Sequence, residues 1–594
     1  MEREEIAENL KWKTSDVFAS EEAWEAEYKA VEKEYLNYDF SSYKGKLSDK
    51  ETLLACFAFN DKVSRRIEKL YLYAHLLHDQ DVRVSKYTSM NAKISALVSK
   101  IFAQFSFVEP ELTKLDDELL QSFINDPDFA AYEYKLRQIS KSKAHVLSEA
   151  EEKLLTLGGD VMQEFRGIFT MLDNANLNLP KATYNGEEIP MSHGMYGVIL
   201  HTGNAAERKE WFEKYYGAYI NLIDAITQTY YANVKKDVFY KTVRNYESCM
   251  AMAMDGEDVT PKVYENLIEA VQNALPVMHD YIRLRKEASG LQEQHMYDIY
   301  VPLAQNAEIK MPFEKAYDLV VEGLAPLGKE YQELLQKARR ERWIDVCENE
   351  GKRSGAYSAG IYDVHPFVLL NYQETTNDIF TIAHEMGHAL HSYKSSGKQP
   401  YAKADYTIFL AEIASTVNEV LLLKHLYKNT EDKNLKKYLL NYYMDMIRAT
   451  LFRQTQFAQF EQIAHAKAEA GEPLTKDALC AAYYELNQAY YGDGIIHDKQ
   501  IAYEWARIPH FYTSFYVYKY ATGITSAISI VKRILTEGES AVRDYFKFLS
   551  SGGCTDPVTI LQNTGVDLTT KAPFEAAMQE FKDTLEAFKE LCKE

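Results

Sequence analysis

Apolar and polar residues alternate along this chain mainly with helical spacing. Amphipathic patterns with a period of about 3.6 residues recur from end to end. Long stretches lack helix breakers, and the first Pro is Pro110. No internal repeat or low-complexity tract interrupts these patterns. The sequence therefore predicts a mainly α fold.

Two amphipathic helices are predicted between residues 379 and 421. In the first, a stripe of apolar side chains lies opposite a pair of His residues and consists of Ile379, Ile382, Ala383, Met386, Ala389 and Leu390. In the second, the apolar stripe consists of Ile408, Phe409, Ile413, Val417, Val420 and Leu421, and another face carries Glu412, Ser415 and Glu419. Each helix therefore has a core-facing back and a polar front.

Short strands are predicted just before the first of these helices. Gly355-Ala-Tyr357 lies beside turn signals, and Phe367-Val-Leu-Leu370 is a continuous apolar run between Pro366 and Asn371. A small β-sheet is therefore expected beside the first helix. An edge strand of such a sheet can pair with the backbone of an extended peptide, which makes Gly355 and Tyr357 candidates for substrate binding.

Turn-forming residues gather between residues 178 and 197. Pro180, Pro190 and the pair Asn185-Gly186 lie there, and Asn-Gly is typical of a two-residue hairpin turn. We expect an N-terminal helical region over residues 1–180 and a second, catalytic region over residues 181–594. A shorter stretch containing Ser, Gly and Pro, residues 394–403, is expected to form a flexible link between the two amphipathic helices.

Length and charge narrow the possible partners. The formal net charge of −21 argues against nucleic acid, because phosphate binding needs clustered Lys and Arg. A chain of 594 residues exceeds a single-core domain about two- to three-fold, so it can enclose an internal cavity. No apolar run approaches the ~18 residues of a membrane span, and the acidic start lacks the apolar core of a signal peptide.

Cysteine usage favours a reducing compartment. The six Cys are scattered and show no Cys-x-x-Cys spacing, so neither a thiolate metal site nor a disulfide framework is expected. We therefore expect a cytoplasmic protein. The cysteines are Cys56, Cys249, Cys347, Cys480, Cys554 and Cys592.

The strongest chemical pattern is His384-Glu-Met-Gly-His388. Two His four positions apart on a helix lie about 40° apart around its axis, so both imidazoles can reach one metal ion. Glu385 points about 100° away, which suits it to activating a metal-bound water as a general base rather than to binding the metal. The pattern predicts a zinc hydrolase.

A catalytic zinc ion usually takes three protein ligands and leaves one position open, so a third ligand is needed. Position 394, where one known pattern has a third His, is Lys. His391 lies about 60° round the helix from His388, on the same face, and stays an alternative. Glu412 on the neighbouring helix is the preferred third ligand, because three ligands within two turns of one helix meet poorly at a point.

Two runs around these residues resemble the zinc signature of oligoendopeptidase F, within the thimet-oligopeptidase-like metallopeptidases. They are His384-Glu-Met-Gly-His-Ala-Leu-His391 and Ala411-Glu-Ile-Ala-Ser415. The resemblance covers nearly the whole chain. Supporting stretches are the region from Trp12 to Trp24, His295-Met-Tyr-Asp298, Arg353-Ser-Gly-Ala-Tyr357, and His510-Phe-Tyr512 with the Tyr-rich run after it.

The resemblance implies a soluble, mainly helical enzyme that cuts short peptides at internal bonds inside a deep, enclosed channel, using one zinc ion. It implies Glu412 as the third ligand. It also implies that His510 and the tyrosines after it bind substrate and stabilise the transition state. Thimet-type members carry a longer, glycine-containing stretch between the His and the Tyr set, which changes the register at Tyr512 and Tyr516. His510 and Tyr518 therefore match best. Tyr512 and Tyr516 are substrate-binding candidates.

The sequence thus predicts a cytoplasmic zinc metalloendopeptidase that acts on short oligopeptides, with Glu385 as general base. One alternative is a zinc exopeptidase that releases dipeptides, whose cleavage would be confined to a peptide terminus. The other is a catalytically inactive peptide-binding protein, against which the intact set of His384, Glu385, His388 and Glu412 speaks. Short peptides are the expected partners, and neither nucleic acid nor a membrane is expected.

Overall fold

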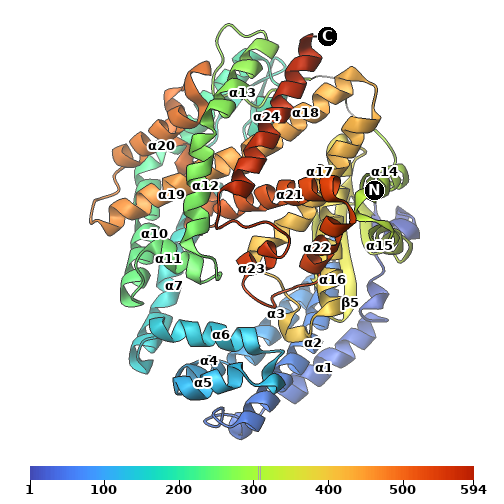
Figure 1. The fold of residues 1–594 in the computed structure, drawn as a ribbon, viewed down its shortest axis with the longest axis vertical. Coiled ribbons are helices and arrows are strands. Elements are labelled where there is room, and N and C mark those ends of the chain that lie inside the picture. The colour runs from blue at the N-terminus through green and yellow to red at the C-terminus, as the bar shows by residue number, and fades with distance from the viewer. Residues whose placement is uncertain (305–306, 308, 594) are drawn as a thin grey trace. The chain divides into compact units, whose positions relative to one another are not determined.

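Helices dominate the structure, a computed structural model that describes residues 1–304, 307 and 309–593. The strands form two small sheets, so the predicted mainly α fold is confirmed. Contacts within the chain group it into two units, each made of three stretches of sequence. Unit 1 comprises Met1–Val146, Glu308–His425 and Ile530–Gly565, and unit 2 comprises Leu147–Ala307, Leu426–Ser529 and Val566–Glu594. Figure 1 shows their helices and strands.

Unit 1 holds a three-stranded sheet and most of the helices from the first quarter of the chain. Its helices are α1 (Glu21–Tyr35), α2 (Lys50–Gln80), α3 (Ser85–Ala103), α4 (Val108–Thr113), α5 (Asp117–Ile124), α6 (Glu133–Ser142), α14 (Phe313–Gly323), α15 (Lys329–Arg340), α16 (Thr376–Lys398), α22 (Glu539–Leu549) and α23 (Pro557–Gln562). Its strands are β3 (Ile344–Cys347), β4 (Tyr357–Ile361) and β5 (Val364–Tyr372).

Unit 2 is built from helices and one hairpin. Its helices are α7 (Glu149–Met171), α8 (His193–Thr202), α9 (Ala205–Asn221), α10 (Ile223–Val243), α11 (Cys249–Asp255), α12 (Pro261–Asn273), α13 (Leu275–Ala288), α18 (Lys433–Ile447), α19 (Arg453–Glu469), α20 (Lys476–Tyr491) and α24 (Ala572–Lys593). Its strands are β1 (Lys181–Tyr184) and β2 (Glu187–Pro190). Two further helices, α17 (Ile408–Asn429) and α21 (Tyr518–Glu537), contribute residues to both units.

The sheet of unit 1 has the strand order β3-β5-β4 and lies between helices α2 and α16. β5 pairs in parallel with β3 and antiparallel with β4, with Tyr357 opposite Leu369. The central strand β5 is buried from Phe367 to Leu370, which explains its continuous apolar sequence. The small sheet beside the first predicted helix is therefore confirmed, and β4 is one of its edges.

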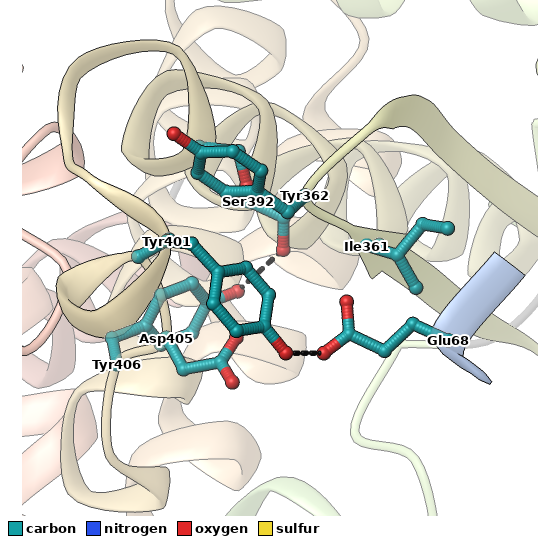
Figure 2. A pocket seen from close by; sticks show the side chains of 10 residues that line it. Glu68, Ile361, Tyr362, Ser392, Tyr401, Asp405 and Tyr406 are labelled. Atoms are coloured by element: carbon teal, nitrogen blue, oxygen red, sulfur yellow. Dashed lines mark hydrogen bonds between the residues drawn. The ribbon is translucent and has the colours of Figure 1, made fainter. Parts of the chain in front are cut away.

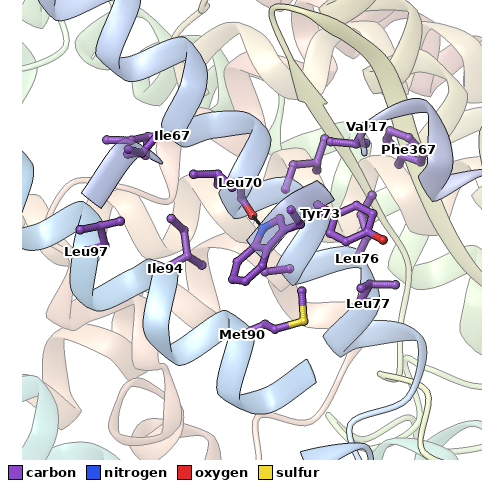
Figure 3. Packing of buried hydrophobic residues seen from close by; sticks show 14 of the residues in the cluster. Val17, Ile67, Leu70, Tyr73, Leu76, Leu77, Met90, Ile94, Leu97 and Phe367 are labelled. Atoms are coloured by element: carbon purple, nitrogen blue, oxygen red, sulfur yellow. Dashed lines mark hydrogen bonds between the residues drawn. The ribbon is translucent and has the colours of Figure 1, made fainter. Parts of the chain in front are cut away.

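One face of this sheet shares a core with α1, α2 and α3 (Figure 3). Leu70, Leu76 and Ile94 are fully buried there, and Phe367 of β5 packs into the same cluster. Trp24 of α1 donates a hydrogen bond from its indole nitrogen to the Leu70 carbonyl at 2.8 Å. Each fully buried Leu or Ile side chain contributes about 1.5–3 kcal/mol, so this core fixes the sheet firmly on α2.

The Asn185-Gly186 hairpin in unit 2 forms as predicted. β1 and β2 pair antiparallel, with Tyr184 opposite Glu187. Asn185 and Gly186 have φ angles of 52° and 82°, the left-handed values that a two-residue turn requires and that Asn and Gly tolerate. The boundary between residues 180 and 181 of the proposed regions stays a prediction, as does an enclosed channel.

The expected flexible link over residues 394–403 is wrong in its first half. Helix α16 continues through it to Lys398, and a short 3-10 helix follows at Tyr401–Lys403. Ser395 is fully buried, and its hydroxyl donates a short hydrogen bond to the Ala404 carbonyl, which holds the helix end in place. Among the helices that the structure describes, none combines the length and the apolar character needed to cross a bilayer.

Candidate metal centre

Helix α16 presents His384 and His388 from a firmly capped start. The Thr375 hydroxyl accepts a hydrogen bond from the Asp378 amide at 3.2 Å, and the Asp378 carboxylate accepts from the Thr375 amide at 2.9 Å. This capping box satisfies amides that the first helical turn leaves without partners. Asp378 therefore caps the start of the helix, where a negative charge is also favourable for the helix dipole.

Gly387, between the two His residues, lets helix α17 lie directly on α16. A Cβ atom at this position would lie 2.6 Å from the Cα of Ser415 and 2.7 Å from the Ala414 carbonyl oxygen. Such distances are too short for any side chain, so only Gly permits this approach. Asn418 adds a link between the helices by donating to the Ala383 carbonyl at 2.9 Å.

Close packing of the two helices brings Glu412 to the His pair. The Nε2 atoms of His384 and His388 lie 3.2 Å apart, and the Glu412 Oε2 atom lies 3.4 Å from the first and 3.5 Å from the second. These residues form the group of potential metal ligands found in the described part of the chain. Ser415 steadies the carboxylate by donating to Oε2 at 3.2 Å.

The spacing of these three atoms fits a zinc ion. Zn–N and Zn–O bonds of about 2.0–2.1 Å in tetrahedral geometry place neighbouring ligand atoms about 3.3–3.4 Å apart. The three observed separations of 3.2, 3.4 and 3.5 Å match the edges of one face of such a tetrahedron. Protein atoms at the three corners of one face would leave the fourth coordination position open for water or substrate, as in catalytic zinc sites.

Glu419 of α17 orients His384 from behind. Its Oε1 atom lies 2.5 Å from Nδ1 of His384, which leaves Nε2 facing the other two ligand atoms. Burial lowers the pKa of His384, but the hydrogen bond and charge of Glu419, with the charges of Glu385 and Glu412, raise it on balance to about 9. Carboxylates behind metal-binding His residues raise their basicity and fix their tautomer. The sequence pattern placed Glu419 on the polar face of its helix but gave it no role.

Replacing Glu419 with Gln should lower the affinity for zinc about 10- to 100-fold, because the Gln amide cannot hold the His384 tautomer or its charge as a carboxylate does. Competition against a fluorescent zinc chelator measures the affinity. The exposed Glu333 of α15 provides a matched control, and Glu333→Gln should bind zinc like the wild type. An unchanged affinity in Glu419→Gln would show that Glu419 does not support the ligand.

Charge at the site favours a cation. Burial raises the pKa of Glu412, but the hydrogen bond and charge of His388 and the charge of His384 lower it on balance to about 2. Glu385 is 7 % exposed, and burial raises its pKa despite the nearby His residues. Glu385 is not one of the three converging residues. Its charge interacts with those of His384, His388 and Glu412, so Glu385 is a buried carboxyl close to the three converging residues.

His391, the alternative third ligand, is part of the core instead. Its ring is fully buried, stacks on Tyr406 at 3.6 Å between centroids, and lies 5.0 Å from the Phe548 ring. Burial lowers its pKa to about 3, so the imidazole is neutral. It is absent from the group of converging ligands among the described residues. His391 therefore contributes to the packing of the core, and Glu412 stays the preferred third ligand.

A separate small cavity of about 30 Å³ lies beside the second half of α16 (Figure 2). Ser392 of α16 and Tyr406 share a hydrogen bond of 2.9 Å across it, and Tyr401 donates to Glu68 of α2. Its volume suffices for about one or two water molecules, so it cannot take a peptide. Burial is the main cause that raises the pKa of Glu68, to about 7.

This raised pKa predicts a pH-dependent stability. The folded pKa of Glu68 exceeds its ordinary value of 4.5, so its contribution to stability is present below pH 4.5 and is lost as the pH rises through 7. Glu68→Gln cannot ionise and should be more stable than the wild type by about 1–3 kcal/mol at pH 8, with little difference at pH 4.5. Denaturant unfolding at both pH values tests this. An equal difference at both, or none at pH 8, would contradict it.

The His510 region belongs to unit 2. His510 is exposed at the start of a 3-10 helix, Pro509–Tyr512, and its ring lies 5.9 Å from the rings of both Tyr516 and Tyr520. The Tyr520 hydroxyl lies 3.4 Å from His510 Nε2. Tyr520 was not predicted as a site residue, since nothing in the Tyr-rich run distinguishes it from its neighbours.

Two other predicted tyrosines of this run are buried. Tyr518 is 1 % exposed and packs on Tyr264 with ring centroids 5.2 Å apart. Tyr512 is 6 % exposed and stacks on Phe169 at 4.5 Å. The structure therefore brings His510, Tyr516 and Tyr520 together at the surface of unit 2 and places Tyr512 and Tyr518 in its core. Catalytic or substrate-binding roles for these residues stay predictions.

Gly355 and Tyr357 lie at the start of the edge strand β4. Gly355 precedes the strand with a φ of 85°, and its carbonyl accepts a hydrogen bond from the Asn371 side chain at 2.8 Å. The Tyr357 ring packs toward α2, 5.8 Å from the His75 ring, which is the sheet face away from α16. At the opposite face, a Cβ on Gly360 would lie 2.7 Å from Ser392 of α16. Any contact of these residues with substrate would therefore come from their backbone.

Comparisons with known proteins agree with this geometry. Residues 198–580 match the model of Peptidase family M3, and residues 111–178 match that of Oligopeptidase F. The chain is 40% identical over 593 residues to Oligopeptidase PepF of Bacillus subtilis, covering 99% of this chain and 88% of that protein. It is 37% identical to an Oligoendopeptidase F homolog of Lactococcus lactis, covering 99% of this chain and 98% of that protein.

Solved structures show the same likeness. A putative peptidase from Chlamydophila abortus superposes with a TM-score of 0.93 at 34% identity and covers 99% of both chains. Oligoendopeptidase-F from Enterococcus faecium superposes with a TM-score of 0.73 at 33% identity, covering 98% of this chain and 100% of that one. Sequence and structure therefore point to the same group of proteins.

Proposed function

Because this chain belongs to peptidase family M3, we propose that it is a zinc endopeptidase that hydrolyses internal bonds of short oligopeptides. The family assignment makes it a metallo-oligopeptidase. The single observation that carries the finer proposal is the convergence of His384, His388 and Glu412, whose facing atoms are separated by 3.2–3.5 Å.

Zinc is the metal that this donor set suits. Two imidazoles and one carboxylate are the protein ligands of many catalytic zinc sites, whereas Mg²⁺ and Ca²⁺ prefer sites made entirely of oxygen. His384, His388 and Glu412 would hold the ion, and Glu419 would keep His384 in the required tautomer. When bound, zinc supplies a Lewis acid that polarises the scissile carbonyl and lowers the pKa of water.

Glu385 would act as the general base. It follows His384 directly on α16, is almost fully buried, and does not join the three converging residues. Its carboxylate would take a proton from the attacking water and pass it to the leaving amine. Burial raises the pKa of this group, which increases its affinity for the proton in transit.

Substrate would be held by two further elements. Strand β4, which starts at Tyr357, is an edge of the sheet in the described part of the chain, and such an edge can pair with the backbone of an extended peptide regardless of its sequence. His510, with Tyr516 and Tyr520, offers donors that could stabilise the negative charge on the carbonyl oxygen in the transition state. Tyr518 and Tyr512 would support this set from the core of unit 2.

Short peptides are the proposed partners, and the cytoplasm is the proposed location. The formal net charge of −21 is unsuited to binding nucleic acid. Six Cys without Cys-x-x-Cys spacing suit a reducing compartment.

Peptides of graded length, blocked at both ends by acetylation and amidation, test the proposed function. The purified protein should cut blocked peptides at internal bonds, and a zinc chelator should abolish the cleavage. Mass spectrometry identifies the fragments. Release of dipeptides only, and only from peptides with a free terminus, would instead show an exopeptidase, and the absence of any cleavage would leave a peptide-binding protein.

A further inference from the structure

The loop that carries Tyr516 crosses a strained point at Phe515. This residue has a φ of 58°, a left-handed value that is unfavourable for a bulky aromatic side chain. The Phe515 ring is nevertheless buried, with centroids 4.5 Å from the His465 ring and 5.8 Å from the Tyr264 ring. A strained backbone persists only where surrounding contacts fix it, so the side chains that contact residues 511–515 must hold Phe515 in this conformation.

Glu461 of α19 provides one of these contacts. Its Oε1 atom accepts a hydrogen bond from the Phe515 amide at 3.0 Å, and the side chain is fully buried. Burial raises the pKa of Glu461 well above its ordinary value. Burying an acid costs free energy unless hydrogen bonds compensate, and the Phe515 amide is the partner of Glu461 Oε1. Glu461 is neither a proposed metal ligand nor the proposed general base.

Asp237 of α10 provides the second contact, at the neighbouring residue. The Ser514 hydroxyl donates to its Oδ2 atom at 2.6 Å, and His465 Nε2 lies 3.1 Å from the same oxygen. The other ring nitrogen of His465 donates to the backbone carbonyl of Glu461 at 2.9 Å, which fixes the orientation of the His465 ring on α19. Asn233 adds a hydrogen bond of 3.3 Å to the Phe511 carbonyl.

Side chains of α10 and α19 therefore hold residues 511–515 by buried hydrogen bonds. This segment lies between His510 and Tyr516 in the sequence. We propose that Glu461 and Asp237 are positioning residues that hold this loop in its strained conformation, so that His510 and Tyr516 face the substrate together. The proposal rests on the proposed function for its catalytic consequence. It assigns to the two acids a role through the loop and no contact with substrate.

Three single variants test this positioning. Glu461→Leu removes the acceptor for the Phe515 amide, whereas Glu461→Gln keeps an acceptor oxygen on a side chain of the same shape. Ser514→Ala removes one hydroxyl from a partly exposed residue and leaves the core unchanged. Thr513→Ala, at the exposed position next to it, is the matched control. For each variant, kcat and KM on a blocked peptide, zinc content and amide hydrogen exchange of the peptide spanning residues 511–518 are measured.

The expected result is a fall in kcat of about 10- to 100-fold in Glu461→Leu, with a smaller fall in Ser514→Ala and unchanged zinc content. Amide exchange over residues 511–518 should rise in both variants. Glu461→Gln and Thr513→Ala should stay close to the wild type in both measurements. Recovery by Gln separates positioning of the loop from a role of the negative charge.

Wild-type kcat and exchange in Glu461→Leu would overturn the proposal. If that variant fails to fold, Ser514→Ala decides, and its wild-type kcat and exchange would overturn the proposal equally. A wild-type protein that cuts no peptide defeats the proposed function and with it the catalytic consequence. Raised exchange over residues 511–518 in that case would still show that the acids anchor the loop, so the two failures can be told apart.

Discussion

Glu385→Gln is expected to keep its zinc and to lose nearly all turnover, with kcat about 10²- to 10⁴-fold below the wild type. Gln has the shape of Glu but cannot accept the proton of the attacking water. The three converging ligand atoms of His384, His388 and Glu412 are untouched by this change, so metal content should stay the same. Metal analysis by mass spectrometry and steady-state kinetics on a blocked peptide measure the two quantities.

The exposed Glu333 of α15 again offers a control for this experiment, since Glu333→Gln makes the same chemical change away from the site. It should match the wild type in both zinc content and kcat. Substantial turnover in Glu385→Gln would show that another group takes the proton. Loss of zinc in that variant would instead make Glu385 part of the metal site.

Glu412→Ala should release the metal, and activity should fall with it. The change removes one of three ligands, and even residues behind the ligands are typically worth about 10- to 100-fold in affinity, so a loss of more than about 100-fold is expected. His391→Phe should keep both metal and activity. Phe preserves the stack on Tyr406 and Phe548, and neither nitrogen of the His391 ring has a hydrogen-bond partner among the described residues.

Equilibrium dialysis against buffered zinc measures both variants, with unfolding curves to confirm that each is folded. A His391→Phe protein that loses its zinc, beside a Glu412→Ala protein that retains it, would reverse the ligand assignment. Loss in both would show that the stack under His391 is needed to hold the helix in place.

Local spacing allowed the convergence of the candidate metal ligands to be predicted from sequence. His384 and His388 are one helical turn apart, so their joint facing follows from helix geometry alone. Glu412 lies on a second predicted helix, and the need for a third ligand selected it. Strand β5 and the Asn185-Gly186 hairpin were also predictable, because a buried apolar run and an Asn-Gly turn each act within a few residues.

Features that depend on packing between distant segments were not predictable in this way. The sequence around Gly387 does not indicate that the backbone of Ser415 packs against this residue. Tyr518 and Tyr520 are two residues apart in a run of aromatics, yet one is buried against Tyr264 and the other lies near His510. The role of Glu419 likewise depends on how α17 packs on α16.

The continuation of α16 beyond residue 394 shows the same limit. Ser395, Ser396 and Gly397 near its end are typical of a turn, and no neighbouring residue in the sequence predicts that the helix continues. The helix is held there by the buried Ser395 and by its contact with the Ala404 carbonyl. Tertiary contacts of this kind routinely override weak local propensity.

Titration of the metal-free protein with zinc tests the central claim most directly. Activity on a blocked peptide should rise linearly with added zinc and level off at one equivalent per chain, and the Glu412→Ala protein should show no such rise over the same range. Full peptide cleavage by protein that contains no metal, or a plateau that the Glu412→Ala variant reaches equally, would contradict a single catalytic zinc ion held by His384, His388 and Glu412.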